Sequence, residues 1–559
     1  MYENWQGHVA AAVFAASTTV WFGLVNIHVP DPYLDEFFHI PQAQNYCAGD
    51  YTWDPKITTP PGLYLVAKLL SPVLGCSART LRLQNVFTLA LIFSQVLQIR
   101  RFIQTQGYTQ RKKEGLVDKT GEDVPEEQSG DSESDQAPFS TALTAFNIAS
   151  FPPLFFFGSL YYTDIMSTAS VLISYYALLR TTAKTQRSFS DDLVAVLSGI
   201  VALSFRQTNI FWVAVFPAGL TVVNELKKNG HTSSTARRLG YMAIVQESWS
   251  KGTISDSSVR DGGLDGSGSI MFLLTTVIAA LSSPVKVMRS VIAYVSLLLS
   301  FAGFVVWNGS VVLGDKSAHT ATIHIPQMLY IWPYIALFSA PVLIGPLFCC
   351  MAHLLPSNIG VKLGVKQRSP YTVYPQPLQA IVFIAIGLVA VHFNTIVHPY
   401  TLADNRHYVF YVFKLLLRHP ALKYLAVPVY YAFFWLSIQS LAHPTSVPEA
   451  SRLKVPARPW REAVQISFVI IWLVTTALSV VTAPLVEPRY FIVPWIVWRL
   501  HVPHAPTVFS TGGRTYAPDL RVLVETVWLL AINQTLQYLF LNKPFTWPSE
   551  PGKLQRFLW

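Results

Sequence analysis

Residues 8–39 read HVAAAVFAASTTVWFGLVNIHVPDPYLDEFFH. The first part of this stretch, residues 8–29, is apolar and long enough to cross a bilayer, which takes about 20 such residues. The second part places two carboxylates, Asp35 and Glu36, just beyond the end of that span. Charge beside hydrocarbon is costly and usually has a function. The stretch therefore indicates a membrane protein with acid–base chemistry on a lipid-borne substrate.

The composition supports this interpretation across the whole chain. Of 559 residues, 51% are hydrophobic and only 13% are charged, whereas a soluble domain carries about 25% charged residues. We predict an all-α polytopic membrane protein with about 12 to 14 spans. The spans are expected at 8–29, 81–102, 139–159, 162–180, 191–206, 208–223, 286–307, 325–350, 377–397, 421–442, 463–484 and 520–541, with shorter interfacial or re-entrant segments at 62–75, 408–417 and 490–499.

The net charge of +10 does not indicate a nucleic-acid partner, because the excess Lys and Arg fall in short connecting loops, as the positive-inside rule describes. Residues 111–135 are the exception, with nine Asp/Glu against four Lys/Arg, and we expect them to be disordered. The predicted organisation is a first span, lumenal catalytic loop and second span (1–103), an acidic cytosolic linker (104–137), core spans (138–223), a polar cytosolic connector (224–285) and a C-terminal membrane region (286–559).

The span count also assigns sides. If both connectors are cytosolic, loop 30–80, the turns at 161–164 and 205–209, loop 398–420 and the segment 487–490 are all lumenal. Every polar cluster of interest then lies on one side of the membrane.

The four cysteines define no framework. Cys47 and Cys76 fall in the same predicted compartment and are able to pair, whereas Cys349 and Cys350 are expected to be packed thiols. The N-terminus lacks a cleavage signal, so the first span is expected to be retained.

The first loop carries the signature of a short helix. Asp31 is suited to cap it, and Asp35, His39 and Gln42 share one face at about 100° per residue. Pro41 is expected to end this helix after about two turns. One interpretation is a catalytic carboxylate with a neighbouring imidazole, and the other is an interfacial amphipathic helix with solvated charges.

Further polar side chains at span ends each allow two interpretations. Segment 53–62 is rich in turn formers and predicts a pocket wall, although Asp54, Lys56 and Thr58 could contact substrate. Asp164 is suited either to cap a helix or to bind a ligand. Arg206 either binds a phosphate or extends its head group to the membrane surface.

Segment 398–408 is the richest in polar groups, and segment 487–490 directly follows a predicted span. They are expected either to bind substrate or to lock loops and helices together, and no Cys/His spacing matches a standard metal site. The candidate residues there are His398, Asp404, Asn405, Arg406, His407, Tyr408, Glu487, Arg489 and Tyr490.

Several of these segments closely resemble motifs of one enzyme family. They are LDEFFHIPQAQ (34–44), WDPKITTPPGLY (53–64), FRQTN (205–209), LADNRHY (402–408), EPRYFI (487–492), FTWP (545–548) and QRF (555–557). The family is the endoplasmic-reticulum α-1,2-glucosyltransferase that uses dolichyl phosphate glucose to add the last glucose to the lipid-linked oligosaccharide. The resemblance implies a GT-C architecture, a lumenal active site and a donor whose polyprenyl tail lies in the membrane lipid.

The implied chemistry is one inverting displacement, in which a carboxylate takes the proton of the acceptor hydroxyl as dolichyl phosphate leaves. Asp35 is the expected base, with His39 on its face and Glu36 as a rival. The dolichyl-diphosphate oligosaccharide would be the acceptor, and neither a metal nor a cofactor is required. The expected phosphate-binding residues are Arg206, Arg406, Arg489, His398 and His407.

Three other functions stay open from the residues alone. A related enzyme using dolichyl phosphate mannose would need the same residue types. A transporter would predict inverted repeats and charges at midmembrane depth, and the sequence shows no such repeat. A non-catalytic scaffold would tolerate loss of the carboxylates.

Overall fold

The computed structural model describes residues 5–113, 136–228, 240–259, 266–316, 322–354, 374–442, 464–483, 485–505, 509–511, 514–516 and 519–559. Most of the acidic linker, whose disorder was predicted, lies outside these ranges. The described chain is built from helices with two small β-hairpins, so the predicted all-α membrane architecture is confirmed.

The N-terminal half is a succession of long and short helices. In order they are α1 (Trp5–His28), α2 (Glu36–Ala48), α3 (Gly62–Leu74), α4 (Ala78–Lys113), α5 (Gln136–Ala149), α6 (Pro152–Phe157), α7 (Thr163–Thr182), α8 (Phe189–Leu203), the 3₁₀ turn η2 (Gln207–Asn209), the π-helical turn η3 (Phe211–Val215), α9 (Phe216–Lys227), α10 (Tyr241–Lys251), α12 (Gly266–Ser282) and α13 (Pro284–Asn308).

The C-terminal half adds further helices and both hairpins. Its helices are α14 (Gln327–Leu354), α16 (Pro377–Asn394), α17 (Pro399–Ala403), α18 (Tyr408–Leu416), α19 (Pro420–Gln439), α20 (Ile466–Val481), the 3₁₀ turn η6 (Pro488–Phe491), α21 (Ile492–His501) and α22 (Leu520–Asn542). The antiparallel strand pairs are β1 (Phe509–Thr511) with β2 (Arg514–Tyr516), and β3 (Phe545–Thr546) with β4 (Leu554–Gln555).

Within the described ranges, seven helical segments are long and apolar enough to cross a membrane. They are Trp5–His28, Ala78–Thr105, Gln207–Lys227, Pro284–Asn308, Gln327–Phe348, Pro377–Asn394 and Pro420–Gln439. Shorter apolar helices include α3, α12 and α20, so the total span count stays a prediction. The span expected at 139–159 is divided at Phe151, because Pro152 and Pro153 begin the new helix α6 and lack the N–H groups that would continue α5.

Aromatic side chains fill the centre of the bundle. Trp21, Trp472, Trp495 and Trp498 are all essentially buried. The rings of Phe151 and Trp495 stack at 3.8 Å between centroids. Apolar side chains on the outside are exposed, as on α13, where Trp307 is 82% exposed, and such surfaces suit contact with lipid.

Helix α2 departs from its predicted bounds. It begins at Glu36, with Asp35 rather than Asp31 at the N-cap position, and it continues through Pro41 to Ala48. Proline costs one backbone hydrogen bond. Tertiary contacts hold the helix beyond it: Ile40 and Tyr46 are buried in a small core with α3, and the Gln42 side chain bonds the carbonyl oxygen of Thr52.

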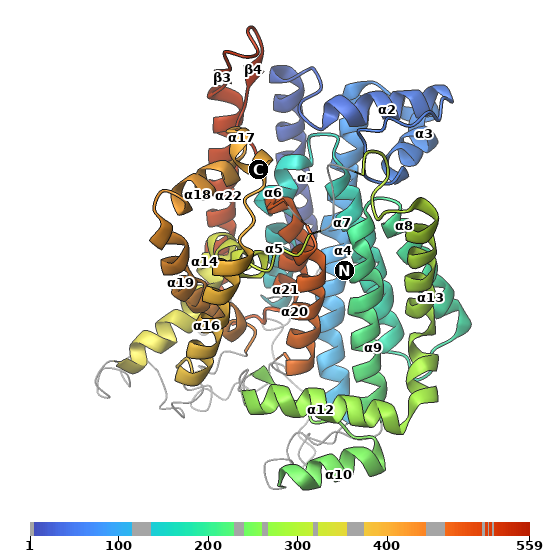
Figure 1. The fold of residues 1–559 in the computed structure, drawn as a ribbon, viewed down its shortest axis with the longest axis vertical. Coiled ribbons are helices and arrows are strands. Elements are labelled where there is room, and N and C mark those ends of the chain that lie inside the picture. The colour runs from blue at the N-terminus through green and yellow to red at the C-terminus, as the bar shows by residue number, and fades with distance from the viewer. Residues whose placement is uncertain are drawn as a thin grey trace.

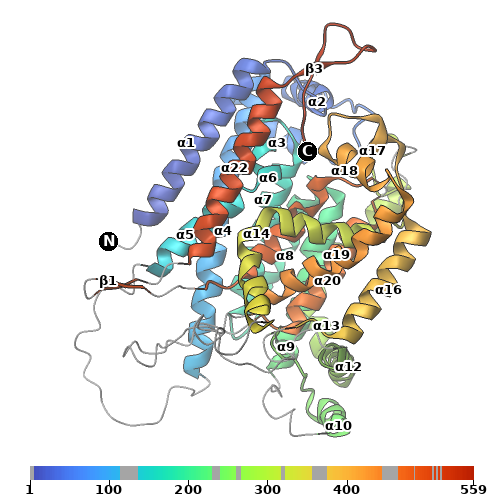
Figure 2. The same cartoon turned by 90° about the vertical axis from the view of Figure 1, so that its left-hand side faces the viewer.

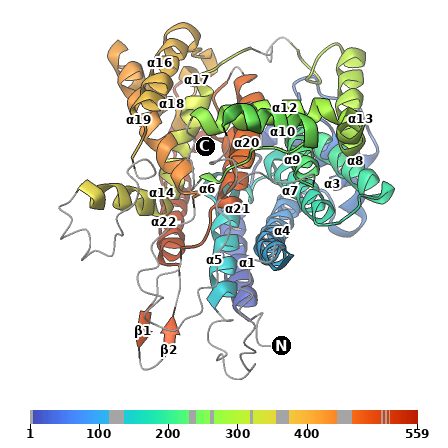
Figure 3. The same ribbon diagram turned by 90° about the horizontal axis from the view of Figure 1, so that it is seen from below.

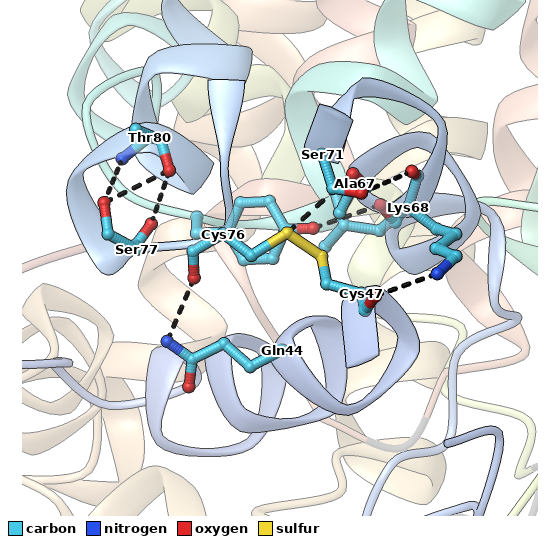
Figure 4. Close-up of a disulfide and its surroundings, with 10 residues drawn as sticks. Gln44, Cys47, Ala67, Lys68, Ser71, Cys76, Ser77 and Thr80 are labelled. Atoms are coloured by element: carbon cyan, nitrogen blue, oxygen red, sulfur yellow. Dashed lines mark hydrogen bonds between the residues drawn. A yellow bond between two sulfur atoms is a disulfide. The ribbon is translucent and has the colours of Figure 1, made fainter. Parts of the chain in front are cut away.

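Cys47 and Cys76, which the sequence left able to pair, form a disulfide, and Figure 4 shows it between the end of α2 and the residues before α4. Two side chains bond the cysteine carbonyl oxygens. Lys68 Nζ donates to that of Cys47 at 2.8 Å, and Gln44 Nε2 donates to that of Cys76 at 3.1 Å. The loop between spans α1 and α4 is therefore covalently closed.

The two ends of the bundle carry different elements. Figures 1 and 2 show α2, α3, α17 and the β3–β4 hairpin at one end and α10 with α12 at the other. Seen from that second end, α12 lies across the bundle (Figure 3), and it packs against α9, α13 and α20. The connector expected to be polar over 224–285 thus includes an apolar helix, because residues 270–281 of α12 are predominantly apolar.

Candidate active site

A cavity of about 500 Å³ opens at the α2 end of the bundle. It lies between the start of α2, the start of α7, segment 206–212 and the segment that follows α20. Many of the residues selected from the sequence line it, namely Asp35, His39, Lys56, Thr58, Asp164, Arg206, Glu487, Arg489 and Tyr490. The fold therefore gathers charged side chains from both ends of the sequence around one space.

Asp35 projects into this cavity from the first turn of α2. Its Oδ2 accepts a hydrogen bond from Arg489 Nη1 at 2.8 Å, and its backbone N–H donates to the hydroxyl of Tyr162 at 3.3 Å. The preceding residue, Leu34, has a φ of 53°, which is rare outside glycine and recurs at functional sites. The side chain of Asp35 is 41% exposed, so it is open to a ligand while Arg489 holds it.

The surroundings of Asp35 favour its charged form. Burial alone would raise its pKa, but the charge of Arg489 and the hydrogen bond from it oppose that effect, and the pKa lies below its usual 3.8. Asp35 is therefore a carboxylate at neutral pH and is able to accept a proton.

His39 lies one turn along α2 from Asp35, on the predicted shared face. Its Nδ1 is 2.6 Å from the hydroxyl of the buried Tyr64. Burial lowers the pKa of His39, and this effect outweighs the attraction of Asp35 for the charged form. The imidazole is therefore neutral at pH 7, with a ring orientation set by Tyr64.

Arg489 lies close to three carboxylates that line the cavity. Its Nη2 lies 2.8 Å from Glu487 and its Nη1 lies 3.6 Å from Oδ2 of Asp164. The guanidinium also lies over the rings of Phe157 and Tyr162, 5.4 and 5.5 Å from their centroids. This packing fixes the plane of the arginine beside Asp35.

Arg206 contacts Asp164, the carboxylate that Arg489 also approaches. Its Nη1 is 2.6 Å from Oδ1 of Asp164, and its guanidinium lies over the ring of Tyr490 at 5.7 Å. Asp164 is almost fully buried at the start of α7. Two arginines thus converge on one carboxylate at the cavity wall.

The loop that carries Lys56 and Thr58 is docked on the end of α8. Gln207 Nε2 donates to the carbonyl oxygen of Thr58 at 2.7 Å, and Gly62 N–H donates to that of Ser204 at 2.7 Å. A Cβ at Gly62 would come within 2.5 Å of the same Ser204 oxygen, so only glycine allows this approach. The loop is therefore a fixed wall of the cavity, as predicted for segment 53–62.

Asp54, in the same loop, is not among the lining residues. Its Oδ1 accepts a hydrogen bond from the backbone N–H of Lys56 at 2.9 Å, and its own N–H donates to Gln42 at 3.1 Å. The geometry gives Asp54 a role in the turn rather than in contact with a ligand.

Glu36 points away from the cavity and is fully buried. Its carboxylate is paired with the equally buried Arg82, at 2.8 Å through Nε and 2.6 Å through Nη2. It also accepts hydrogen bonds from the backbone N–H groups of Tyr33 and Tyr161. The two adjacent carboxylates therefore have different surroundings, and only Asp35 faces the cavity. Arg82 was not among the residues selected from the sequence, although a charge at the start of the span expected at 81–102 is a signal that could have identified it.

The structure does not bring segment 398–408 into the cavity. Asp404 pairs with Arg406 at 2.6 Å, and Arg406 also bonds Gln555 and lies over the ring of Trp547. Asn405 Oδ1 accepts the indole N–H of Trp547 at 2.9 Å.

The remaining residues of this segment hold the last residues of the chain. His407 Nδ1 lies 2.7 Å from the carbonyl oxygen of Trp559, Tyr408 N–H donates to Leu558, and His398 caps α17. The expected roles of this segment toward substrate therefore have no support from the cavity geometry. Of its residues, His407 still contributes to the lowered pKa of Asp35.

Residues 29–500 match the model of the DIE2/ALG10 family. The chain belongs to the DIE2/ALG10 family. All residues that line the cavity lie within the matched part, whereas the β3–β4 hairpin lies beyond it. The membership confirms the resemblance seen in the sequence motifs.

Relatives in this family cover nearly the whole chain. A protein of Pyricularia oryzae named "Dol-P-Glc:Glc(2)Man(9)GlcNAc(2)-PP-Dol alpha-1,2-glucosyltransferase" is 36% identical over 97% of this chain and 91% of its own length. Proteins with the same name from Emericella nidulans and Mus musculus are 37% and 31% identical, over 97% and 95% of this chain and 96% and 93% of their own lengths.

Among solved structures, an oligosaccharyltransferase from Archaeoglobus fulgidus aligns with 98% of this chain and 62% of its own chain, at 13% identity and a TM-score of 0.24. That likeness is too weak to carry an argument, so the GT-C arrangement stays an expectation from the resemblance.

Proposed function

We propose that this DIE2/ALG10 family protein is an inverting glucosyltransferase of the endoplasmic-reticulum membrane. It would transfer glucose from dolichyl phosphate glucose to the diglucosylated lipid-linked oligosaccharide, in an α-1,2 linkage. The names of the relatives support this donor and acceptor. The observation that carries the proposal is Asp35, paired with Arg489, in a cavity that Arg206 also lines.

The cavity suits a donor with a polar head and an apolar tail. Arg206 and Arg489 lie at one wall and supply guanidinium groups for a phosphate. Phe301 from α13 and Val493 from α21 line another part of the same cavity. A polyprenyl chain would leave along such apolar side chains toward the membrane lipid.

The proposed step is a single displacement at the anomeric carbon. Asp35 takes the proton from the acceptor hydroxyl, whose oxygen forms the new bond to the sugar. The bond between the anomeric carbon and the phosphate oxygen breaks, and its electron pair leaves with dolichyl phosphate. Arg206 stabilises the charge that develops there. A β-linked donor thus gives an α-linked product.

Transfer of labelled sugar by the purified protein tests this function. Dolichyl phosphate glucose and dolichyl phosphate mannose are supplied separately, with the diglucosylated lipid-linked oligosaccharide as acceptor. Transfer of glucose alone, in an α-1,2 linkage, is expected. Transfer of mannose would identify a mannosyltransferase, and transfer of neither sugar by folded protein would favour a transporter or scaffold.

Asp35→Asn tests the assignment of the base. This change keeps the shape of the side chain but removes the group that takes the proton, so transfer is expected to fall by about 10²–10⁴-fold. Asp31→Asn, an exposed carboxylate of the same loop outside the cavity, is the matched control and is expected to keep its activity. Equal activity of the two variants would overturn the assignment.

A further inference from the structure

Two buried polar side chains project from the start of α4 toward two different loops. Arg82 and Asn85 are both fully buried and lie one turn apart on this helix. Neither lines the cavity. The contacts of each define what it holds.

Arg82 holds the loop that leads into α2. Its Nη1 donates to the carbonyl oxygen of Val29 at 2.7 Å, and its Nη2 donates to that of Asp31 at 2.9 Å. Nε and Nη2 together bind both carboxylate oxygens of Glu36. The fork of the guanidinium thus fixes the loop just before Asp35 and the residue just after it.

Asn85 holds the second loop, which leads into α7. Its side-chain amide donates to the carbonyl oxygens of Leu160 at 2.7 Å and Tyr162 at 2.9 Å. These residues come shortly before Asp164 at the cavity wall.

Glu36 joins the two loops directly. Its Oε2 accepts the backbone N–H of Tyr33 at 3.0 Å, and its Oε1 accepts that of Tyr161 at 2.7 Å. A second link runs from the backbone N–H of Asp35 to the hydroxyl of Tyr162. Glu36, which is next to Asp35, is therefore bonded to the loop before α7. Tyr162, two residues before Asp164, is in turn bonded to the loop before α2.

We propose that Glu36, Arg82 and Asn85 are positioning residues that fix Asp35 relative to Asp164 and its two arginines for transfer of the sugar. This inference rests on the proposed glycosyl transfer. A buried ion pair is by itself weak support for stability, because an apolar pair can serve as well. All three guanidinium nitrogens of Arg82 donate hydrogen bonds, so this side chain fixes the relative positions of the groups it binds. A displacement of about 1 Å at a reacting group is able to lower the rate 10²-fold.

A second buried pair in the same chain provides the matched control. Arg499 and Glu525 lie 2.5 Å apart, are equally buried, and Glu525 also accepts a hydrogen bond from Asn147. None of these three residues lines the cavity. Glu36→Gln and Glu525→Gln therefore remove the same charge from similar surroundings, one beside the cavity loops and one elsewhere.

The first measurement compares kcat, KM for dolichyl phosphate glucose and thermal midpoint in Glu36→Gln, Asn85→Ala and Glu525→Gln. The first two variants are expected to lose about 10²-fold in kcat while KM changes little, because Glu36→Gln releases the loop of Asp35 and Asn85→Ala releases the loop before Asp164, so that Asp35 loses its position relative to Asp164. Glu525→Gln is expected to lose stability but to keep kcat. A kcat within about twofold of wild type in folded Glu36→Gln, or an equal loss of kcat in Glu525→Gln, would overturn the positioning role.

Backbone hydrogen exchange gives a readout that is independent of activity. In Glu36→Gln the segment 158–165 is expected to lose protection at the N–H of Tyr161, whereas Asp35→Asn is expected to leave it protected. Unchanged exchange in Glu36→Gln would contradict the link between the loops. Absence of transfer by the wild-type protein would instead count against the proposed function, so the two failures are distinguishable.

Discussion

The surroundings of Asp35 lower its pKa, and this has a consequence for the pH dependence of transfer. Burial favours its neutral form, while Arg489 favours the carboxylate, and the pKa lies below 3.8. The ion pair therefore contributes to stability above pH 3.8, and that contribution is lost as the pH falls through the lower pKa of the folded protein. The activity of Asp35 as a base is expected to be lost in the same acidic range.

Arg489→Gln tests this origin of the charge. Without the guanidinium, the effect of burial is less opposed, so the pKa of Asp35 rises and the acid limb of the rate profile moves to higher pH. Single-turnover rates across pH measure the shift. Arg406→Gln removes an arginine that is paired with Asp404 outside the cavity, and its acid limb is expected to stay in place. The same acid limb in wild type and Arg489→Gln would contradict the explanation.

The orientation of the His39 ring is predicted to depend on the hydroxyl of Tyr64. Tyr64→Phe removes the partner of its Nδ1, which is worth about 1 kcal/mol, so transfer is expected to slow about fivefold without unfolding. Tyr46→Phe is the control, because Tyr46 packs against Tyr64 in the same small core and has no bond to His39. If both variants have the same rate, the orientation of His39 does not depend on Tyr64.

At the scale of elements, α2 shows what local rules miss. The predicted helical face of Asp35, His39 and Gln42 is present, although Gln42 bonds a loop instead of facing the cavity. The predicted end at Pro41 is wrong, because burial of Ile40 and Tyr46 against α3 outweighs one lost hydrogen bond.

The disulfide of this element is expected to contribute to stability rather than to chemistry. Cys47 and Cys76 are separated by 29 residues, and closing a loop of that size is worth about 2–4 kcal/mol. The double change Cys47→Ser, Cys76→Ser is therefore expected to lower the thermal midpoint in detergent while transfer at low temperature persists. Cys350→Ser, a thiol outside the disulfide, is the control. An unchanged midpoint in the double variant would refute this expectation.

At the scale of the whole molecule, α2, whose first residues line the cavity, and the α10–α12 pair lie at opposite ends of the bundle (Figure 1), which predicts opposite sides of the membrane. Lys553→Cys on the β3–β4 hairpin is expected to be protected from an impermeant maleimide in sealed microsomes. Lys251→Cys on α10 is expected to react. Both side chains are well exposed, at 72% and 66%, so detergent is expected to make both reactive. Reaction of both residues in sealed vesicles would contradict the assigned sides.

The sequence by itself determined the membrane class, several of the spans and the family. These properties follow from the local transfer of apolar residues into lipid and from motifs that are contiguous in the chain. It also identified most of the charged residues that line the cavity, because charges at span ends are rare enough to stand out.

Only the tertiary structure decided which of two adjacent carboxylates faces the cavity and where segment 398–408 lies. Asp35 and Glu36 differ through Arg489 and Arg82, which are remote in sequence and reach them only by packing. Segment 398–408 likewise binds the last residues of the chain instead of the cavity. A charge pair depends on distances between helices, and the local pattern of residues contains no measure of those distances.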